Sequence, residues 1–61
     1  MNSWTMQDVK NFDAWLRERG GQVNYPVQET FNGQYIIPMN EPKGMTGQEA
    51  VDTYDKEVVN A

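Results

Sequence analysis

The sequence predicts a small α+β domain in which a helix, an antiparallel β-hairpin and a second helix follow one another. Two stretches, residues 5–19 and 47–59, place apolar side chains at the spacing of amphipathic helices. Between them, residues 27–37 contain two β-prone runs joined by Asn32 and Gly33, the strongest short-range hairpin signal. Because 61 residues are the size of one domain, we expect a single domain, with the hairpin packed by both helices.

The first helix has a recognisable signal at each end. Thr5 is a favourable N-cap residue, and Trp4 before it can pack on Val9 as a hydrophobic staple. Gly20 and Gly21 follow the helix and predict a C-terminal stop. These signals place the helix at residues 5–19.

Each predicted helix has one apolar stripe and one intrahelical ion pair. The stripes consist of Met6, Val9, Phe12 and Leu16 with Trp15 at the edge, and of Val51, Tyr54 and Val58 flanked by Ala50. Opposite charges four residues apart predict the ion pairs Asp13–Arg17 and Asp52–Lys56.

A two-residue type I′ turn is expected at the tip of the hairpin. This turn needs a positive φ at Asn32 and at Gly33, and it pairs Phe31 with Gln34 and Thr30 with Tyr35. One face then carries Val27, Glu29, Phe31, Gln34 and Ile36, and the other carries Gln28, Thr30, Tyr35 and Ile37. Since neither face is purely polar, we expect both to be covered, either by the helices or by a second copy of the chain.

The segments that flank the hairpin are harder to assign. Residues 22–26 form an extended segment that either pairs as a third strand or lies over the core. Pro38 is expected to end the second strand, and Pro38, Pro42 and Gly44 together predict that residues 39–45 form an irregular connector. Thr46 and Glu49 match a capping box and begin the second helix.

The composition argues against several kinds of chemistry. The chain has no cysteine and no histidine, which leaves no disulfide, no ordinary zinc site and no histidine-based catalysis. The one serine, Ser3, is close to the N-terminus, and no glycine-rich phosphate loop is present. We therefore expect a protein that is not an enzyme and that binds neither a cofactor nor a metal.

The net charge narrows the range of partners. A charge of −4 and a pI of 4.4 argue against direct binding to nucleic acid or to an anionic membrane, because both require a basic surface. The same charge favours basic partners. With no membrane-spanning stretch and no secretory signal, we expect a soluble cytoplasmic protein.

Negative charge is concentrated near the C-terminus. Residues 1–20 contain three acids and three bases, whereas residues 41–61 contain five acids and two bases. We name four acids of the second helix the acidic helix face: Glu49, Asp52, Asp55 and Glu57. We expect this face to contact a partner, and we expect replacement of Asp52 and Asp55 by lysine to leave the fold intact. The competing interpretation is a solvated helix face, since charge runs usually serve solubility.

Aromatic residues are numerous for so small a core. The spacing of apolar residues predicts that four of these side chains point into the core: Phe12, Trp15, Phe31 and Tyr54. Tyr35, on the more polar face of the predicted hairpin, is the aromatic residue best placed to contact a partner.

These observations favour an acidic inhibitor or modulator that binds the basic surface of a nucleic-acid-handling protein, with carboxylates in place of phosphates. In size and acidity the chain is similar to small accessory proteins of phages and other mobile elements, many of which inhibit host enzymes by binding where DNA would bind. The alternative is a structural or assembly subunit that binds through the apolar face of the hairpin. A small core and a two-sided hairpin also predict a homodimer.

Overall fold

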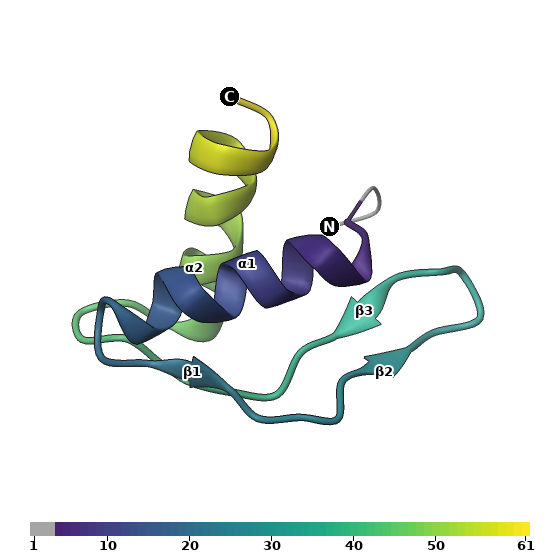
Figure 1. Cartoon of the computed structure of the whole chain (residues 1–61), viewed down its shortest axis with the longest axis horizontal. Coiled ribbons are helices and arrows are strands. Elements are labelled where there is room, and N and C mark those ends of the chain that lie inside the picture. Colours follow the sequence, from purple (N-terminus) through teal and green to yellow (C-terminus); the bar gives the residue numbers. More distant parts are fainter. Residues whose placement is uncertain (1–3) are drawn as a thin grey trace.

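The computed structural model describes residues 4–61 and confirms an α+β fold with the expected order of elements. The helices are α1 (Met6–Arg17) and α2 (Gly47–Tyr54), and α2 continues into a π-helical turn, η1 (Asp55–Val59). The strands are β1 (Gln22–Val23), β2 (Gln28–Glu29), β3 (Tyr35–Ile36) and β4 (Met39–Asn40). Both helices lie on the same side of the strands (Figure 1).

Local signals determine both ends of α1. Thr5 is the N-cap, and it forms a capping box with Asp8, whose carboxylate accepts from the Thr5 N–H at 2.8 Å. At the C-terminus, Gly20 has a φ of +87°. The Gly21 N–H donates to the Leu16 carbonyl at 2.9 Å and the Gly20 N–H to the Arg17 carbonyl at 3.3 Å, which is the Schellman pattern. The predicted cap and stop are confirmed.

Asp13 ties α1 to the strand that follows it. One carboxylate oxygen accepts from Arg17 Nε at 3.2 Å, as predicted, and the other accepts from the Val23 N–H at 2.8 Å. The side chain of Asp13 is only 14% exposed, and its bond to Val23 is partly shielded from water, whereas Arg17 is 59% exposed.

The strands form one long, interrupted ribbon. Strand β1 pairs with β4, and β2 pairs with β3, both antiparallel. The segment after α1 is therefore a strand, but its partner lies beyond the hairpin. The prediction that residues 39–45 are irregular is wrong for Met39–Asn40. A bond from the Asn24 N–H to the Pro38 carbonyl, 2.8 Å long, spans the interruption, and the Tyr25–Pro26 peptide there is cis.

The hairpin forms where the sequence places it, but its turn is different. The Gly33 N–H donates to the Thr30 carbonyl at 2.9 Å, and the Thr30 N–H donates to the Gln34 carbonyl at 2.7 Å. Gly33 has a φ of +80°, whereas Asn32 does not have a positive φ. This is a three-residue loop, a type I turn followed by a left-handed glycine. The type I′ prediction is wrong.

The longer loop shifts the pairing by one residue, so that Glu29 faces Tyr35 and Gln28 faces Ile36. A shift of one residue moves the side chains of β3 to the opposite face relative to β2. Val27, Tyr35 and Ile37 now share one face and pack against the core, while Ile36 is 54% exposed on the other face. The predicted register would have divided these three residues between two faces, so burial of one apolar face explains the choice.

Gly33→Val tests the turn. A β-branched residue is strained at a φ of +80°, and we expect the substitution to lower the free energy of unfolding by about 1–3 kcal/mol. Space is not the cause, because a Cβ added at Gly33 would meet no atom within 4 Å. Thermal melts of the variant and the parent should therefore differ clearly, and coincident melts would contradict the left-handed glycine.

The core is an aromatic cluster between α1, α2 and the segment before α1. Phe12 lies 5.2 Å from both Trp4 and Tyr54, measured between ring centroids, and Trp15 lies 5.5 Å from Tyr54. The Trp4 and Phe12 rings meet edge to face, a favourable geometry for aromatic pairs. Phe12, Trp15 and Tyr54 point inward as predicted. Phe31 does not, because it lies in the hairpin loop and is 99% exposed.

The π-helical turn changes which side chain completes the apolar stripe of α2. Ala50, Val51 and Tyr54 are buried as predicted, but Val58 is 47% exposed and Val59 packs against the core instead. In η1 the Asn60 N–H donates to the Asp55 carbonyl at 2.8 Å, five residues back. With an i to i+5 repeat, Val59 follows Tyr54 on the same face.

Candidate functional site

The four acids of the acidic helix face differ in their exposure and in their hydrogen-bond partners. Glu49 is exposed and closes the predicted capping box, since its carboxylate accepts from the Thr46 N–H at 3.0 Å. Asp52 is exposed and accepts from Gln48 Nε2 at 2.9 Å. Within residues 4–61 no ion pair joins Asp52 to Lys56, so that prediction is wrong. The Asp52 carboxylate bonds instead to Gln48, one turn earlier on α2, and Lys56 is exposed to solvent.

Asp55 holds the two ends of the chain together. Its carboxylate accepts from the indole Nε1 of Trp4 at 2.7 Å, across 51 positions in the sequence. Asp55 is half-buried, and Trp4 is buried in the aromatic cluster. This contact contradicts the expectation that Asp55 can be replaced by lysine without affecting the fold. Glu57, the last member of the acidic helix face, is exposed in η1.

Asp55→Ala measures the structural role of this carboxylate. We expect the free energy of unfolding to fall by about 1–3 kcal/mol, because the buried indole N–H loses its acceptor. Asp55→Asn keeps an acceptor oxygen and should lose less. Urea unfolding followed by tryptophan fluorescence measures both. An alanine variant as stable as the parent would show that the bond to Trp4 contributes nothing.

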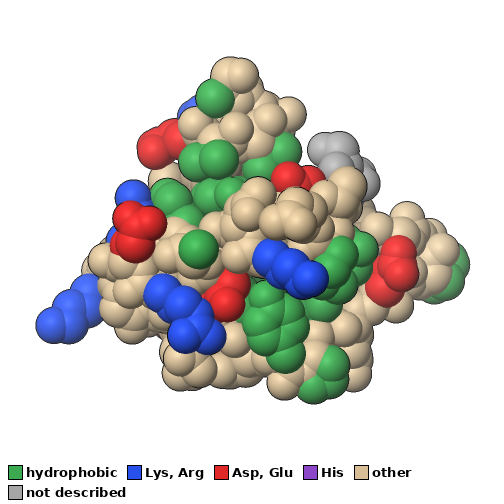
Figure 2. Space-filling view, viewed as in Figure 1, with side chains coloured by type: hydrophobic (Ala, Val, Ile, Leu, Met, Phe, Trp, Pro, Cys, Tyr) green, Lys and Arg blue, Asp and Glu red, His purple; other side chains and the backbone are tan. Residues whose placement is uncertain are grey.

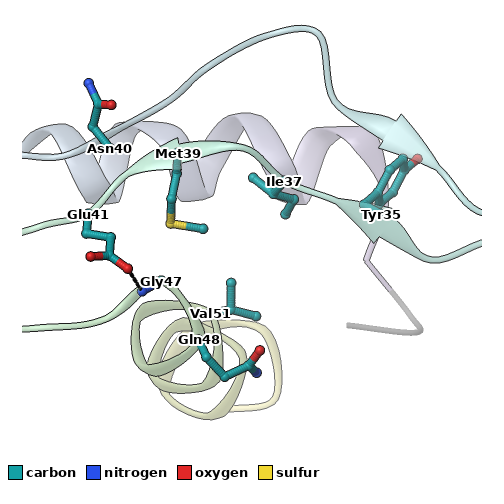
Figure 3. A pocket seen from close by; sticks show the side chains of 8 residues that line it. All are labelled: Tyr35, Ile37, Met39, Asn40, Glu41, Gly47, Gln48 and Val51. Atoms are coloured by element: carbon teal, nitrogen blue, oxygen red, sulfur yellow. Dashed lines mark hydrogen bonds between the residues drawn. The ribbon is translucent and has the colours of Figure 1, made fainter.

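Beside α2 lies an open groove of about 740 Å³, which the sequence did not reveal. Ile37 and Met39 point from the ribbon toward α2, and Val51 points back from α2 (Figure 3). Residues from both elements line the groove: Tyr35, Ile37, Met39, Asn40, Glu41, Gly47, Gln48 and Val51. Tyr35, which we expected to contact a partner, is half-buried at one end of this set.

Glu41 closes the other end of the groove. Its Oε2 accepts from the Gly47 N–H at 2.7 Å, at the first residue of α2 (Figure 3). A carboxylate at this position is favourable because the N-terminus of a helix carries partial positive charge. Glu41 is one of the five acids of residues 41–61, but the sequence did not predict that it belongs to a site. The available signal was an acid shortly before a capping box.

Charge is unevenly distributed over the molecule: acids and bases are equal in number in residues 1–20, and acids are in excess from residue 41 onward. Lys and Arg side chains gather along α1 on the face shown in Figure 2. Arg19 stacks on Trp15, with the guanidinium carbon 4.0 Å from the ring centroid, and its Nη1 donates to the Trp15 carbonyl at 2.9 Å. Four exposed acids lie on or beside α2 and η1: Glu41, Glu49, Asp52 and Glu57. Lys43 and Lys56 are the only bases from residue 41 onward.

Two tyrosines have raised pKa values. Burial is the main cause for both, and the negative charge of Asp8 adds to the pKa of Tyr54, as that of Asp13 adds to the pKa of Tyr25. Both hydroxyls therefore remain protonated at neutral pH. Among residues 4–61, no three metal-ligating side chains lie together. Ser3 lies outside the described residues. In the described part of the chain, no helix has the length and apolar character needed to cross a membrane.

Comparison with known proteins gives no match, whether with protein-family models, curated proteins or solved structures. The candidate site therefore rests on its own geometry: a groove lined by both apolar and polar residues, beside a group of exposed carboxylates.

Proposed function

We propose that this protein is a non-enzymatic inhibitor or modulator that binds a basic, nucleic-acid-binding surface of another protein. The observation that carries the proposal is the group of exposed carboxylates at α2, η1 and the segment before them. These are Glu41, Glu49, Asp52 and Glu57, against two lysines in the same third of the chain. The absence of cysteine supports a reducing compartment such as the cytoplasm.

The carboxylates would act in place of phosphates. Glu49 and Asp52 are three residues apart on α2, so their backbone positions differ by about 4.5 Å along the helix axis. A surface that binds the phosphates of DNA or RNA through Lys and Arg would meet negative charge at a comparable spacing. Such a complex forms rapidly and weakens as salt rises from ~50 to ~300 mM, because exposed charges are screened over that range.

Charge reversal at two exposed positions tests this proposal. Asp52→Lys with Glu57→Lys should abolish binding to the partner and leave stability nearly unchanged, since exposed substitutions usually change it by less than about 0.5 kcal/mol each. Asp55 is left intact because it bonds to Trp4. The matched control is Glu18→Lys with Glu29→Lys, which changes the net charge equally at exposed positions outside α2.

The measurement starts from affinity capture in the native host with identification of the partner by mass spectrometry, followed by binding of the purified partner. The proposal requires a nucleic-acid-binding partner that is displaced by duplex DNA or RNA. It also requires that the control pair binds and the Asp52/Glu57 pair does not. Two results would refute the phosphate-mimic function. One is a partner that binds both double variants equally, and the other is a partner whose binding is changed neither by nucleic acid nor by salt.

One observation favours a second candidate, an assembly subunit that binds through the hairpin. Phe31 is 99% exposed at the hairpin tip and Ile36 is 54% exposed on the outer face, although both are large apolar side chains. If these residues join two copies, sedimentation equilibrium over a hundredfold concentration range should show a dimer, and Phe31→Ser should remove it. A single 7.0 kDa species at all concentrations would exclude the homodimer.

A further inference from the structure

We propose that the groove between the ribbon and α2 binds an amphipathic basic segment of a partner protein. An apolar side chain of that segment would lie on Ile37, Met39 and Val51, with an adjacent Lys or Arg at Glu41. The proposal rests on the proposed function, because it names the part of a basic partner that the acidic side of the molecule recognises.

One part of the groove wall is apolar and can hold an apolar anchor. Ile37 and Met39 are half-buried, so each packs on the core with part of its surface and presents the rest to the groove. Methionine is unbranched and adapts its shape to different partners. A volume of about 740 Å³ lies within the range of protein pockets that hold small ligands, and here it would receive a few side chains.

The polar residues at the groove favour a cation beside the anchor. Glu41 uses Oε2 to accept from Gly47, and within residues 4–61 its Oε1 accepts no hydrogen bond. Gln48 also lines the groove, and its bond to Asp52 places a second carboxylate nearby. A Lys or Arg that follows the apolar anchor can therefore pair with Glu41 Oε1 while remaining close to Asp52.

The negative charge near the groove disfavours two other occupants, nucleic acid and a second copy of the chain. Nucleic acid would bring phosphates to Glu41. A second copy would bring its hairpin, where Glu29 lies two residues from Phe31, and a net charge of −4 on each molecule opposes the approach. A basic amphipathic segment has the complementary charge together with the apolar surface that the groove can cover.

The test is an NMR titration of the full chain with a synthetic peptide. The probe is an alanine-based helical peptide of about 14 residues, long enough for partial helicity, with leucines on one face and lysines beside them. One control peptide has glutamate in place of lysine, and another has serine in place of leucine. We expect the first peptide alone to shift the amide resonances of Ile37, Met39, Gly47 and Val51.

Two adjacent isoleucines supply the matched variants. Ile37→Lys puts a positive charge in the groove, whereas Ile36→Lys puts the same charge one residue earlier, on the outer face of β3. We expect the first to raise the Kd of the lysine peptide at least about tenfold and the second to change it less than about twofold. Gln48→Lys, at an exposed position, repeats the test without changing a partly buried side chain.

Three results would overturn the inference: no shift with the lysine peptide, equal binding of the glutamate or serine peptides, or equal effects of Ile36→Lys and Ile37→Lys. Shifts confined to the surroundings of Asp52 and Glu57 would also overturn it. That last result would leave the proposed function standing, because the acidic helix face would still bind a basic segment. The opposite result is also distinguishable. If the Asp52/Glu57 double variant still binds the lysine peptide in the groove, the groove inference is supported, even when that variant also keeps its natural partner and the proposed function fails.

Discussion

Phe12→Ala is expected to lower the free energy of unfolding by about 3–5 kcal/mol. Phe12 is fully buried, and its ring contacts Trp4, Trp15 and Tyr54. Truncation removes the centre of this cluster and leaves a cavity that neighbouring aromatic rings cannot fill by small movements. At about 0.05–0.15 kcal/mol per residue, a chain of 61 residues has a total stability of about 3–9 kcal/mol, so this loss is at least about a third of the total.

The other phenylalanine provides a matched control. Phe31→Ala removes the same atoms from a side chain that is 99% exposed, and it should change stability by less than about 0.5 kcal/mol. Urea unfolding monitored by circular dichroism measures both variants. Similar losses for the two would mean that Phe31 is buried in solution, either against its own chain or between two copies.

Gly21→Ala should also have a large effect and lower the free energy of unfolding by about 1–3 kcal/mol or more, because the clash is with backbone atoms. A Cβ at Gly21 would lie 2.5 Å from the Asn40 carbonyl oxygen and 2.9 Å from the Pro42 nitrogen. Neither atom belongs to a flexible side chain, so the segment after β4 would have to move away from the end of α1. Such a movement would also disturb the pairing of β1 with β4.

Gly47→Ala separates this clash from the general effect of replacing glycine. A Cβ at Gly47 would meet its nearest atoms, Glu41 Oε2 and Met39 Sδ, at 3.5 Å, which is ordinary contact. Alanine at this first helical position should stabilise the protein by about 0.4–1 kcal/mol through the unfolded state. Thermal melting should therefore shift in opposite directions for the two variants. A stable Gly21→Ala protein would contradict the close approach of residues 21 and 40–42.

The helices were predictable because their causes are local. Thr5 and Thr46 cap helices through residues three positions away, and Gly20 ends α1 through bonds within one turn. The buried positions of α1 follow from a spacing of three or four residues, with one exception, Met6, which lies at the exposed end of its stripe. The sequence also located the hairpin, since Gly33 adopts a positive φ in either type of turn.

The register of the hairpin was decided by the rest of the molecule. Asn32 and Gly33 are compatible with a two-residue or a three-residue loop, and the dipeptide alone cannot distinguish them. The three-residue loop gathers Val27, Tyr35 and Ile37 on the side that packs against the core. Burial of that face outweighs the local preference, which is why the turn was predicted wrongly while its position was right.

The candidate site depends almost entirely on tertiary structure. The sequence determined that the C-terminal third is acidic, but it did not show that Asp55 is bonded to Trp4 or that Glu41 is at the N-terminus of α2. Nor did it show the groove, whose walls come from residues 35–41 and from α2. Composition and periodicity indicate the net charge of a segment and which side chains share one face of a helix or strand. Only the packing of α2 against the ribbon determines which carboxylates are exposed and which apolar side chains stay partly uncovered.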